Sequence, residues 1–244
     1  MPDLLILRFD APLIAFGGVL VDEHGVTRLF PARAMLAGLL ANALGYDHRE
    51  ADRVQALQTR LRFAVRCDRP GQLWADYQTV DLSQKFLLRG WTTRGKFEER
   101  AGGSARIGTH IRFRSFIADA VYTLTLTLTE TAEAPSINDL EAALREPARP
   151  LFIGRKPCLP SAPILTARAA APTLLQALET FPLARRADRG HPLAAWWPSD
   201  EDMGRPASRL IPITDDRDWR NQIHAGRRWI HEGTINVHDT ALDD

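Results

Sequence analysis

Hydrophobic and polar residues alternate most regularly between Val121 and Thr129, where leucines occupy positions 124, 126 and 128 and threonines the odd positions. A period of two places one set of side chains on each face of a strand, so this segment is predicted to be a β-strand. The segment Leu61–Cys67 alternates in the same way and predicts a second, half-buried strand. The apolar run Leu4–Phe9, closed by Asp10-Ala11-Pro12, predicts a buried first strand.

Four segments have helical spacing or helix-start signals. Apolar pairs at positions 35/36, 39/40 and 43/44 predict a helix that opens at Phe30-Pro31 and ends at Gly45. A second helix is predicted over residues 49–59. Ser136, with Asp139 three residues later, resembles a capping box and predicts a helix that ends before Pro147. A further helix is predicted over residues 172–181.

The predicted order is strand, helix, helix, strand, long insertion, strand and helix. This order is close to the split βαββαβ unit of ferredoxin-like or RRM-like α+β proteins, which we expect over residues 1–163. The insertion, at about residues 83–116, is too long for a structureless loop and is predicted to project as a β-hairpin. After Pro163 we expect a smaller β-rich region, residues 164–244, packed on the first domain. Within it we predict a loop over 182–198 and short strands near 209–213 and 228–235.

The composition narrows the class of protein. Of the 244 residues, 45% are hydrophobic and 25% are charged, which excludes disordered and fibrous classes. The longest apolar run, residues 11–21, is too short to span a membrane, and no secretory signal is expected, so we expect a cytoplasmic protein without a membrane partner. Two cysteines, Cys67 and Cys158, exclude a disulfide scaffold and a Cys-rich zinc module. The seven histidines are scattered, and neither a metal nor another cofactor is expected.

The net charge of +1 hides a strongly basic segment. Between Gln84 and Phe116 lie eight Lys and Arg residues against two Glu, interleaved with aromatic residues and glycines. Cations contact phosphates and aromatic rings stack on bases, so this composition predicts RNA binding. The expected contact residues of this segment are Arg89, Trp91, Arg94, Lys96, Arg106, Arg112 and Arg114. A solvated charged loop is the alternative for the segment, and ordinary hairpin packing is the alternative for Trp91.

Two other places have cations in an anion-binding context. Gly154-Arg155-Lys156, followed by Pro157, predicts a tight turn with accessible backbone and two adjacent positive charges, which favours a phosphate. Arg33 lies in the first turn of the first predicted helix, where free N–H groups already favour an anion. A surface ion pair is the alternative role for Arg33.

Six short motifs occur in order along nearly the whole chain. They are Leu4-Leu5-Ile6-Leu7-Arg8 leading to Ala15-Phe16-Gly17; Phe30-Pro31-Ala32-Arg33 with the helix to Leu44-Gly45; Phe63-Ala64-Val65-Arg66-Cys67-Asp68; Asp76-Tyr77-Gln78-Thr79-Val80; Ile153-Gly154-Arg155-Lys156-Pro157-Cys158 with Pro163; and Trp229-Ile230 with Gly233 and Val237. Together they make the chain similar to the CasD family, the subunit of type I-E CRISPR Cascade that holds the 5′ end of the guide RNA.

The resemblance implies a protein of the RAMP superfamily with a ferredoxin-like palm, a β-hairpin thumb and a smaller β-rich C-terminal part. It implies binding to the 5′ handle of crRNA in antiviral defence, and contacts with a large CasA-type subunit and a CasC-type backbone subunit. Target DNA is expected to be met only indirectly, through the complex. The resemblance also adds Gln78 to the expected RNA contacts, at a position where the family is expected to have histidine. It implies no catalytic residues, because this subunit of type I-E complexes is not the nuclease that processes the guide.

Two other functions are compatible with the sequence. One is a metal-independent endoribonuclease that cuts CRISPR repeat RNA, with His24 or Tyr46 as the base and Lys85 or Lys96 stabilising the developing charge. In the other there is no RNA role, and the basic hairpin is an arm that docks a protein.

Overall fold

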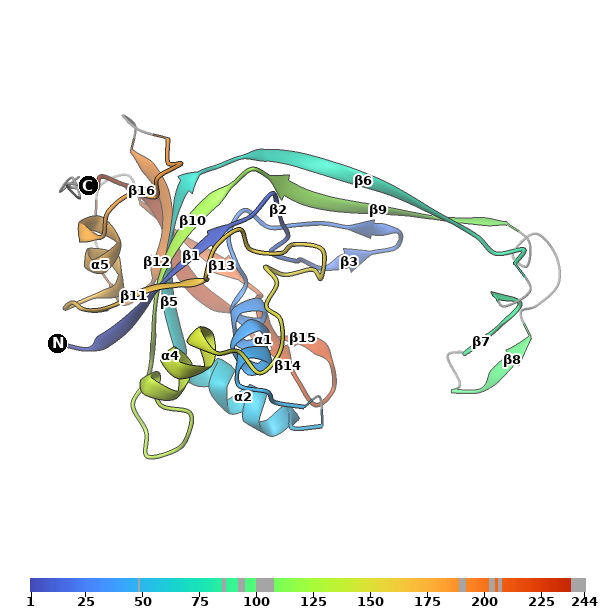
Figure 1. Ribbon diagram of the computed structural model, residues 1–244, viewed down its shortest axis with the longest axis horizontal. Helices are drawn as coiled ribbons and strands as arrows, with labels where there is room; N and C mark the ends of the chain where they lie inside the picture. Colours follow the sequence, from blue (N-terminus) through green and yellow to red (C-terminus); the bar gives the residue numbers. More distant parts are fainter. Residues whose placement is uncertain are drawn as a thin grey trace.

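The computed structural model describes residues 1–47, 49–84, 87–91, 95–99, 108–188, 192–201, 205 and 208–237 (Figure 1). The helices are α1 (Arg33–Ala43), α2 (Ala51–Arg60), α4 (Ile137–Arg145) and α5 (Leu174–Thr180). The strands are β1 (Asp3–Asp10), β2 (Leu13–Ile14), β3 (Leu20–Val21), β4 (His24–Gly25), β5 (Leu61–Arg69), β6 (Gln72–Asp81), β7 (Arg89–Trp91), β8 (Phe97–Glu99), β9 (Thr109–Ala118), β10 (Val121–Leu128), β11 (Leu165–Ala170), β12 (Leu193–Pro198), β13 (Arg209–Ile213), β14 (Asp216–Asp218), β15 (Ile223–Ala225) and β16 (Arg228–Ile235). The predicted mixed α+β class is confirmed.

Antiparallel strands form a seven-stranded central sheet in the order β11-β1-β10-β5-β12-β16-β13. Along β1 the side chains alternate between two hydrophobic layers, because successive residues of a strand point to opposite faces. Leu5 and Leu7 pack in the layer of α1, α2 and α4, whereas Leu4 and Ile6 pack in the layer of α5 on the other face (Figure 1). Burial on both faces explains why the sequence of β1 is a continuous apolar run instead of an alternation.

The threonine face of β10 is also buried, which the alternation alone does not indicate. Thr123 and Thr125 are both 0% exposed, and each hydroxyl has a partner. Thr125 Oγ1 donates to the carbonyl oxygen of Leu174 at the start of α5 (2.9 Å), and Thr123 Oγ1 donates to the Asp68 carboxylate (2.7 Å). Hydrogen bonding removes most of the cost of burying these polar groups.

An ion pair inside the sheet joins it to the segment after α5. Arg66 and Asp68 are both 0% exposed and are paired through Nε and Oδ1 at 2.5 Å. Arg66 also donates to the carbonyl oxygens of Phe181 (2.9 Å) and Pro182 (3.1 Å), and Asp68 accepts from the backbone N–H of Ala184 (3.0 Å). Because a buried charge is tolerated only when it is paired and hydrogen-bonded, this pair holds residues 181–184 against the sheet.

The predicted helices are present, with ends within a few residues of the expected ones. The capping box of α4 is confirmed: Ser136 Oγ accepts from the Asp139 N–H (3.2 Å), and the Asp139 carboxylate accepts from the Ser136 N–H (2.7 Å). The turn after α1 contains Gly45 with a φ of +79°, a conformation that favours glycine. No helix in the described part of the chain is long and apolar enough to cross a membrane.

The strands after residue 163 belong to the same central sheet. β11 pairs with β1, while β12, β16 and β13 extend the sheet beyond β5. The strands predicted near 209–213 and 228–235 are confirmed as β13 and β16. The prediction of a loop over 182–198 is wrong for residues 193–198, which form β12. Their sequence has no alternation of polar and apolar residues, and they form a strand because they pair with β5 and β16. The domain boundary after Pro163 stays a prediction.

A two-stranded arm leaves the sheet as a continuation of its central pair β5–β10 (Figure 1). β6 follows β5, β9 precedes β10, and the arm pairing runs from Gln72–Ala118 to Asp81–Thr109. The arm therefore begins before the predicted insertion at 83–116. At its corner Gly71 has a φ of +65°, and a Cβ there would lie 2.3 Å from the carbonyl oxygen of Ala118, so the corner requires glycine. Strands β2 and β4 pair with β9, and β7 and β8 form a hairpin at the far end.

We expect Asp68→Asn to lower the free energy of unfolding by about 3–5 kcal/mol, because it leaves the buried Arg66 charge without a counter-ion. Asp200→Asn is the matched control: Asp200 pairs with Arg62 at the surface (2.9 Å), and its loss should cost less than about 1 kcal/mol. Guanidinium denaturation followed by circular dichroism measures both. Equal losses in the two variants would contradict a structural role for the buried pair.

Candidate nucleic-acid interface

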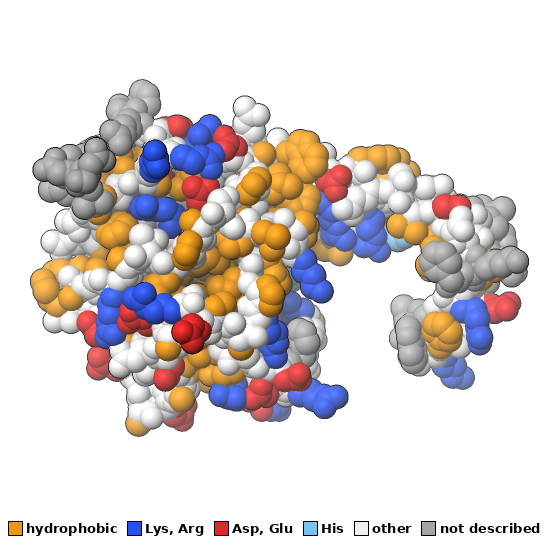
Figure 2. Space-filling model, in the orientation of Figure 1, with side chains coloured by type: hydrophobic (Ala, Val, Ile, Leu, Met, Phe, Trp, Pro, Cys, Tyr) orange, Lys and Arg blue, Asp and Glu red, His pale blue; other side chains and the backbone are white. Residues whose placement is uncertain are grey.

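The strand register places the predicted arginines of β9 on one face of the arm. Asp76 lies opposite Arg114, and Gln78 lies opposite Arg112. Because directly opposite residues of an antiparallel pair share a face, these four side chains form one polar strip, called the arm strip below. Figure 2 shows Lys and Arg side chains on the underside of the arm, facing the space between the arm and the body.

Within the arm strip, the cations are the unpaired groups. Gln78 Nε2 donates to Asp76 Oδ2 at 2.7 Å, so these two polar groups partner each other along β6. Arg112 and Arg114 are half-buried, and neither side chain forms a hydrogen bond or ion pair with any residue that the structure describes. Arginines that a strand holds in place without acidic partners are suited to binding phosphate.

The predicted Gly-Arg-Lys turn lies at the root of the arm. Gly154 has a φ of +93°, and a Cβ there would lie 1.5 Å from the carbonyl oxygen of Ala15, so this close approach requires glycine. The Ala15 N–H donates to the carbonyl oxygen of Ile153 at 3.2 Å and keeps the two segments together. Lys156 is exposed beside this turn and has no hydrogen bond or ion pair among the described residues.

Arg155 points into the structure and fastens the arm to the body. Its guanidinium donates to the carbonyl oxygens of Ser115 in β9 and Gly25 in β4, both at 2.8 Å. It also lies 4.9 Å from the centre of the Phe116 ring. Burial, and then the positive charge of Arg114, lower the pKa of Arg155. Both terminal nitrogens of this side chain therefore donate to carbonyl oxygens inside the protein.

Arg33, the first residue of α1, also has internal partners. Its backbone N–H donates to Asp215 Oδ2 (2.8 Å), and its Nε donates to Asp216 Oδ1 (2.5 Å). Burial alone would lower the pKa of Arg33, but the hydrogen bond and charge of Asp216 and the charge of Asp215 raise it. The predicted anion site at this helix N-terminus thus holds the carboxylate of Asp215, and the guanidinium has the ion pair that was its alternative role. RNA contact by Arg33 stays a prediction.

A cavity of about 450 Å³ lies between the Gly-Arg-Lys turn and the N-terminal end of α1. Its walls include Phe16, Arg28, Arg155 and Trp219. Arg28 is held by a hydrogen bond from Nη2 to the carbonyl oxygen of Thr214 (2.8 Å). No signal in the sequence indicates Arg28 and Trp219, because no local motif relates residues that are so distant along the chain.

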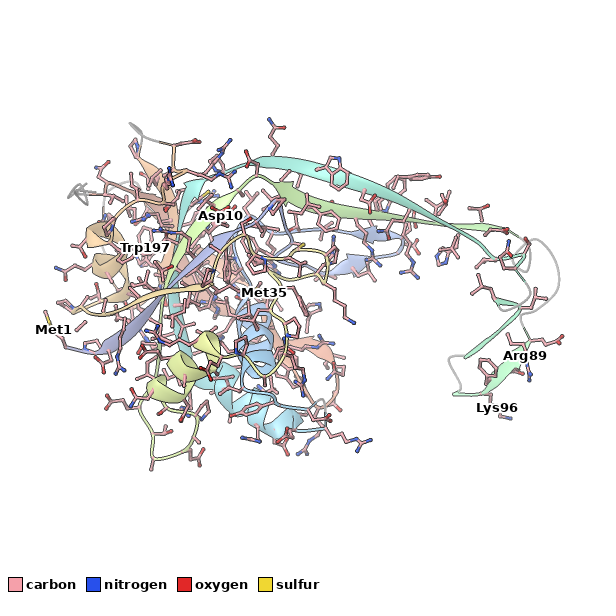
Figure 3. All side chains as sticks on the ribbon, viewed as in Figure 1. Met1, Asp10, Met35, Arg89, Lys96 and Trp197 are labelled. Atoms are coloured by element: carbon pink, nitrogen blue, oxygen red, sulfur yellow. The ribbon has the colours of Figure 1, made fainter. Side chains whose placement is uncertain are left out.

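Three further predicted residues of the hairpin lie at the far end of the arm. Arg89 and Trp91 belong to β7, and Lys96 directly precedes β8 (Figure 3). The Arg89 guanidinium lies 5.3 Å from the centre of the Phe97 ring. Arg94, Arg106 and the side chain of Trp91 lie outside the described residues. The predicted RNA-contact residues that the structure describes thus lie in three places. These are the arm strip together with the Gly-Arg-Lys turn at the root of the arm, the start of α1, and the arm tip.

The opposite face of the arm carries aromatic rings. Tyr77 and Phe113 lie directly across the strand pair with ring centres 5.3 Å apart. On the other side of Phe113, His24 of β4 stacks at 4.9 Å with an angle of 9° between the ring planes. Around Phe113 the arm therefore has cations on one face and aromatic rings on the other, whereas nearer the root Trp74 and Phe116 lie opposite each other on the face of the arm strip.

The groups of the nuclease alternative belong to separate elements. His24 lies in β4, Tyr46 follows α1 and lies under the Arg53 guanidinium (3.9 Å), and Lys96 lies at the arm tip (Figure 3). Lys85 lies outside the described residues. Within the described ranges, no three His, Cys, Asp or Glu side chains are grouped so as to hold a metal ion.

Comparisons with known proteins give consistent matches. A family model described as "CRISPR-associated protein (Cas_Cas5)" matches residues 4–231. The chain is 33% identical over 158 residues to the CRISPR system Cascade subunit CasD of Escherichia coli (strain K12), an alignment that covers 65% of this chain and 67% of the relative. A chain of a CRISPR RNA-guided surveillance complex is similar with a TM-score of 0.67 and 22% identity, covering 96% of this chain and 90% of its own. A crystal structure of a Cas protein is similar with a TM-score of 0.64 and 25% identity, and the match covers 96% of this chain and 95% of the chain in that structure.

We expect Arg155→Ala to lower the free energy of unfolding by about 2–4 kcal/mol, because it removes charge-assisted hydrogen bonds to β9 and β4. The neighbouring variant Lys156→Ala is the control and should change stability by less than about 0.5 kcal/mol. Denaturant titration gives both values, and hydrogen exchange should report faster opening around Gly25 and Ser115 in Arg155→Ala alone. Unchanged stability and unchanged hydrogen exchange around Gly25 and Ser115 in Arg155→Ala would contradict the role of Arg155 in fastening the arm to the body.

Proposed function

Because this chain belongs to the CRISPR-associated Cas5 family, we propose that it is a subunit of a type I-E Cascade complex and binds the 5′ handle of crRNA. The relative from Escherichia coli, named a Cascade subunit, supports the assignment to such a complex. The position of unpaired cations in the structure supports the RNA-binding role, as follows.

We also propose that β1, β5, β10 and β11 form a ferredoxin-like palm. With their helices these strands follow a βαββαβ order along the chain. Their order in the sheet is fourth, first, third and second, and every pairing is antiparallel, which is the arrangement of that fold. On this proposal the arm β6–β9 is the thumb, and the strands that follow β11, namely β12 to β16, form the smaller β-rich part.

The arm strip is the observation that carries the RNA-binding proposal. Arg112 and Arg114 present two guanidinium groups on a rigid strand, and the exposed Lys156 lies on the turn that Arg155 ties to the root of the same strand. A single-stranded RNA backbone along this surface would release counter-ions as its phosphates are neutralised. The cavity beside the root, with an aromatic wall and Arg28, would accept an unstacked base of the same strand.

We propose that the protein holds the RNA without cutting it. General acid–base cleavage requires a base and a charge-stabilising group within reach of one phosphate. The positions of His24, Tyr46 and Lys96 on separate elements, with Tyr46 buried under Arg53, favour a binding role over the nuclease alternative.

The remaining parts of the proposal concern partners and location. We propose that a large CasA-type subunit and a CasC-type backbone subunit contact this protein in the complex. Target DNA would be met only through the complex, and the complex would act in the cytoplasm. The similarity to a chain of a surveillance complex supports an assembled state through the shared fold.

We expect the double variant Arg112→Glu/Arg114→Glu to lower the affinity for 5′-handle RNA by at least about tenfold at low salt. The slope of log K against log salt should become shallower by about 1.4, since each phosphate contact with single-stranded RNA contributes about 0.7. Filter binding across a salt series measures both quantities. Arg145→Glu/Arg209→Glu makes the same charge change at side chains that are 62% and 77% exposed on the body. An equal loss in this control would show that net charge alone, and not the arm strip, governs binding.

Incubation of the purified chain with CRISPR repeat RNA in EDTA separates holding from cutting. We expect tight binding with intact RNA, because no base and charge-stabilising group share one site in the described structure. Gel analysis of end-labelled RNA is the measurement. Specific cleavage that His24→Ala abolishes would contradict the binding role and support the nuclease.

A further inference from the structure

β6 has one edge without a partner strand. Among the described residues β6 pairs with β9 alone, and the other neighbours of β9 lie along its opposite edge. At the end of the pair, the Leu82 N–H donates to the carbonyl oxygen of Gly108. Hydrogen-bonded and non-hydrogen-bonded pairs alternate along antiparallel strands, so the odd residues of β6 turn their N–H and C=O groups away from β9. They are Leu73, Ala75, Tyr77 and Thr79, with Asp81 at the end of the strand.

The outer edge of β6 lacks the features that normally protect an edge strand. Proteins shield such edges with short strands, bulges, Pro, or charged side chains, especially Lys. The two edge strands of the central sheet have these features: β13 is five residues long and contains Pro212, and β11 has Arg168 and a register shift in its pairing. β6 is ten residues long, pairs with β9 without a register shift, and contains neither proline nor a basic residue.

The side chains along this edge favour a protein over an RNA. Leu73 is 71% and Tyr77 56% exposed on the face opposite the arm strip, and Trp74 is 47% and Val80 45% exposed on the face of the arm strip. Figure 2 shows hydrophobic side chains along the upper side of the arm, away from its basic underside. The charged residues of β6 are Asp76 and Asp81, so its outer edge offers no positive charge to a phosphate, whereas the cations Arg112 and Arg114 of the arm strip belong to β9. An extended peptide satisfies a row of alternating N–H and C=O groups, which phosphates and bases cannot do in register.

We propose that the free edge of β6 is a docking site for an extended segment of another protein subunit, which adds to the arm as a further strand. The main-chain groups of the odd residues 73–79 would bind the main chain of the partner, and its side chains would contact the exposed Leu73, Tyr77 and Val80. A segment of apolar character with neutral or basic charge complements this edge, because β6 itself is apolar and acidic. The arm then binds RNA on its basic face and a protein along its outer edge, so this inference goes beyond the RNA-binding role.

Hydrogen–deuterium exchange tests the docking site with the unmodified protein. The chain is compared alone, with crRNA added, and in the complex assembled with its co-encoded subunits. We expect the amides of Leu73, Ala75, Tyr77 and Thr79 to exchange at least about tenfold more slowly in the complex, and to be unchanged by crRNA alone. The neighbouring even amides, already bonded to β9, serve as the internal control. Free exchange of the odd amides in the complex would overturn the proposal, as would their full protection by crRNA alone.

Two variants at one position test the hydrogen-bonding edge directly. Thr79→Pro removes an outward N–H and places a proline ring at the edge, where proline is tolerated because no bond to β9 is lost. Thr79→Val keeps the N–H and the β-branched shape. We expect Thr79→Pro to weaken retention of the neighbouring subunit by about tenfold, with crRNA affinity within about twofold of the parent, and Thr79→Val to retain both.

Equal subunit binding by Thr79→Pro and Thr79→Val would overturn the proposal. A concentration-dependent dimer of the chain alone, with the same protected amides, would also overturn it, because the occupant would then be a second copy. Loss of RNA binding in the Arg112→Glu/Arg114→Glu variant bears only on the arm strip. The two proposals therefore fail independently.

Discussion

The buried pair Arg66–Asp68 fixes the register on which the arm depends. Tyr122 lies opposite Cys67 and Val121 opposite Arg69, so Asp68 is an extra residue in β5 at this point of the pairing. Its carboxylate is held there by Arg66, by Thr123 and by the backbone of the segment after α5. The arm keeps the shifted register from its first pair to its last. Without the shift, Tyr77 would lie opposite Arg112, and the aromatic face and the arm strip would be mixed.

Arginine serves two purposes in this protein, and its surroundings decide which. Of the 31 basic residues 28 are Arg, so a positive charge in the sequence says little about its role. Arg33 and Arg155 have partners inside the protein. Arg33 pairs with Asp216, and Arg155 donates hydrogen bonds to carbonyl oxygens of β9 and β4. Arg112 and Arg114 have no acidic partner in the described structure, although Asp76 lies close to them in register. The turn that looked most like an anion site thus braces the strand that presents the free cations.

Separate surfaces of the arm allow separate partners. Period-two alternation puts Arg112 and Arg114 on one face of the arm and Tyr77 and Phe113 on the other. The position of the arm beyond the sheet leaves the edge of β6 unpaired among the described strands. The root is held in place because Gly71 and Gly154 permit close backbone approaches and Arg155 bonds to Ser115 in β9 and Gly25 in β4. A projecting pair of strands with a fixed root can reach a nucleic acid and a neighbouring subunit at once.

The local elements could be predicted from the sequence: the central strand with alternating leucines, the capped helix at Ser136, and the tight turn at Gly154. The sequence also determined the α+β order and the basic character of the arm, because these follow from neighbouring residues. It did not predict β12, and it did not distinguish the internal role of Arg155 from the free state of Arg112. Both features depend on the tertiary structure. A marginal strand such as β12 forms only beside the strands that pair with it, and the role of an arginine depends on carboxylates and carbonyl oxygens that are distant in the chain. The cavity wall that joins Arg28 to Trp219 exists for the same reason.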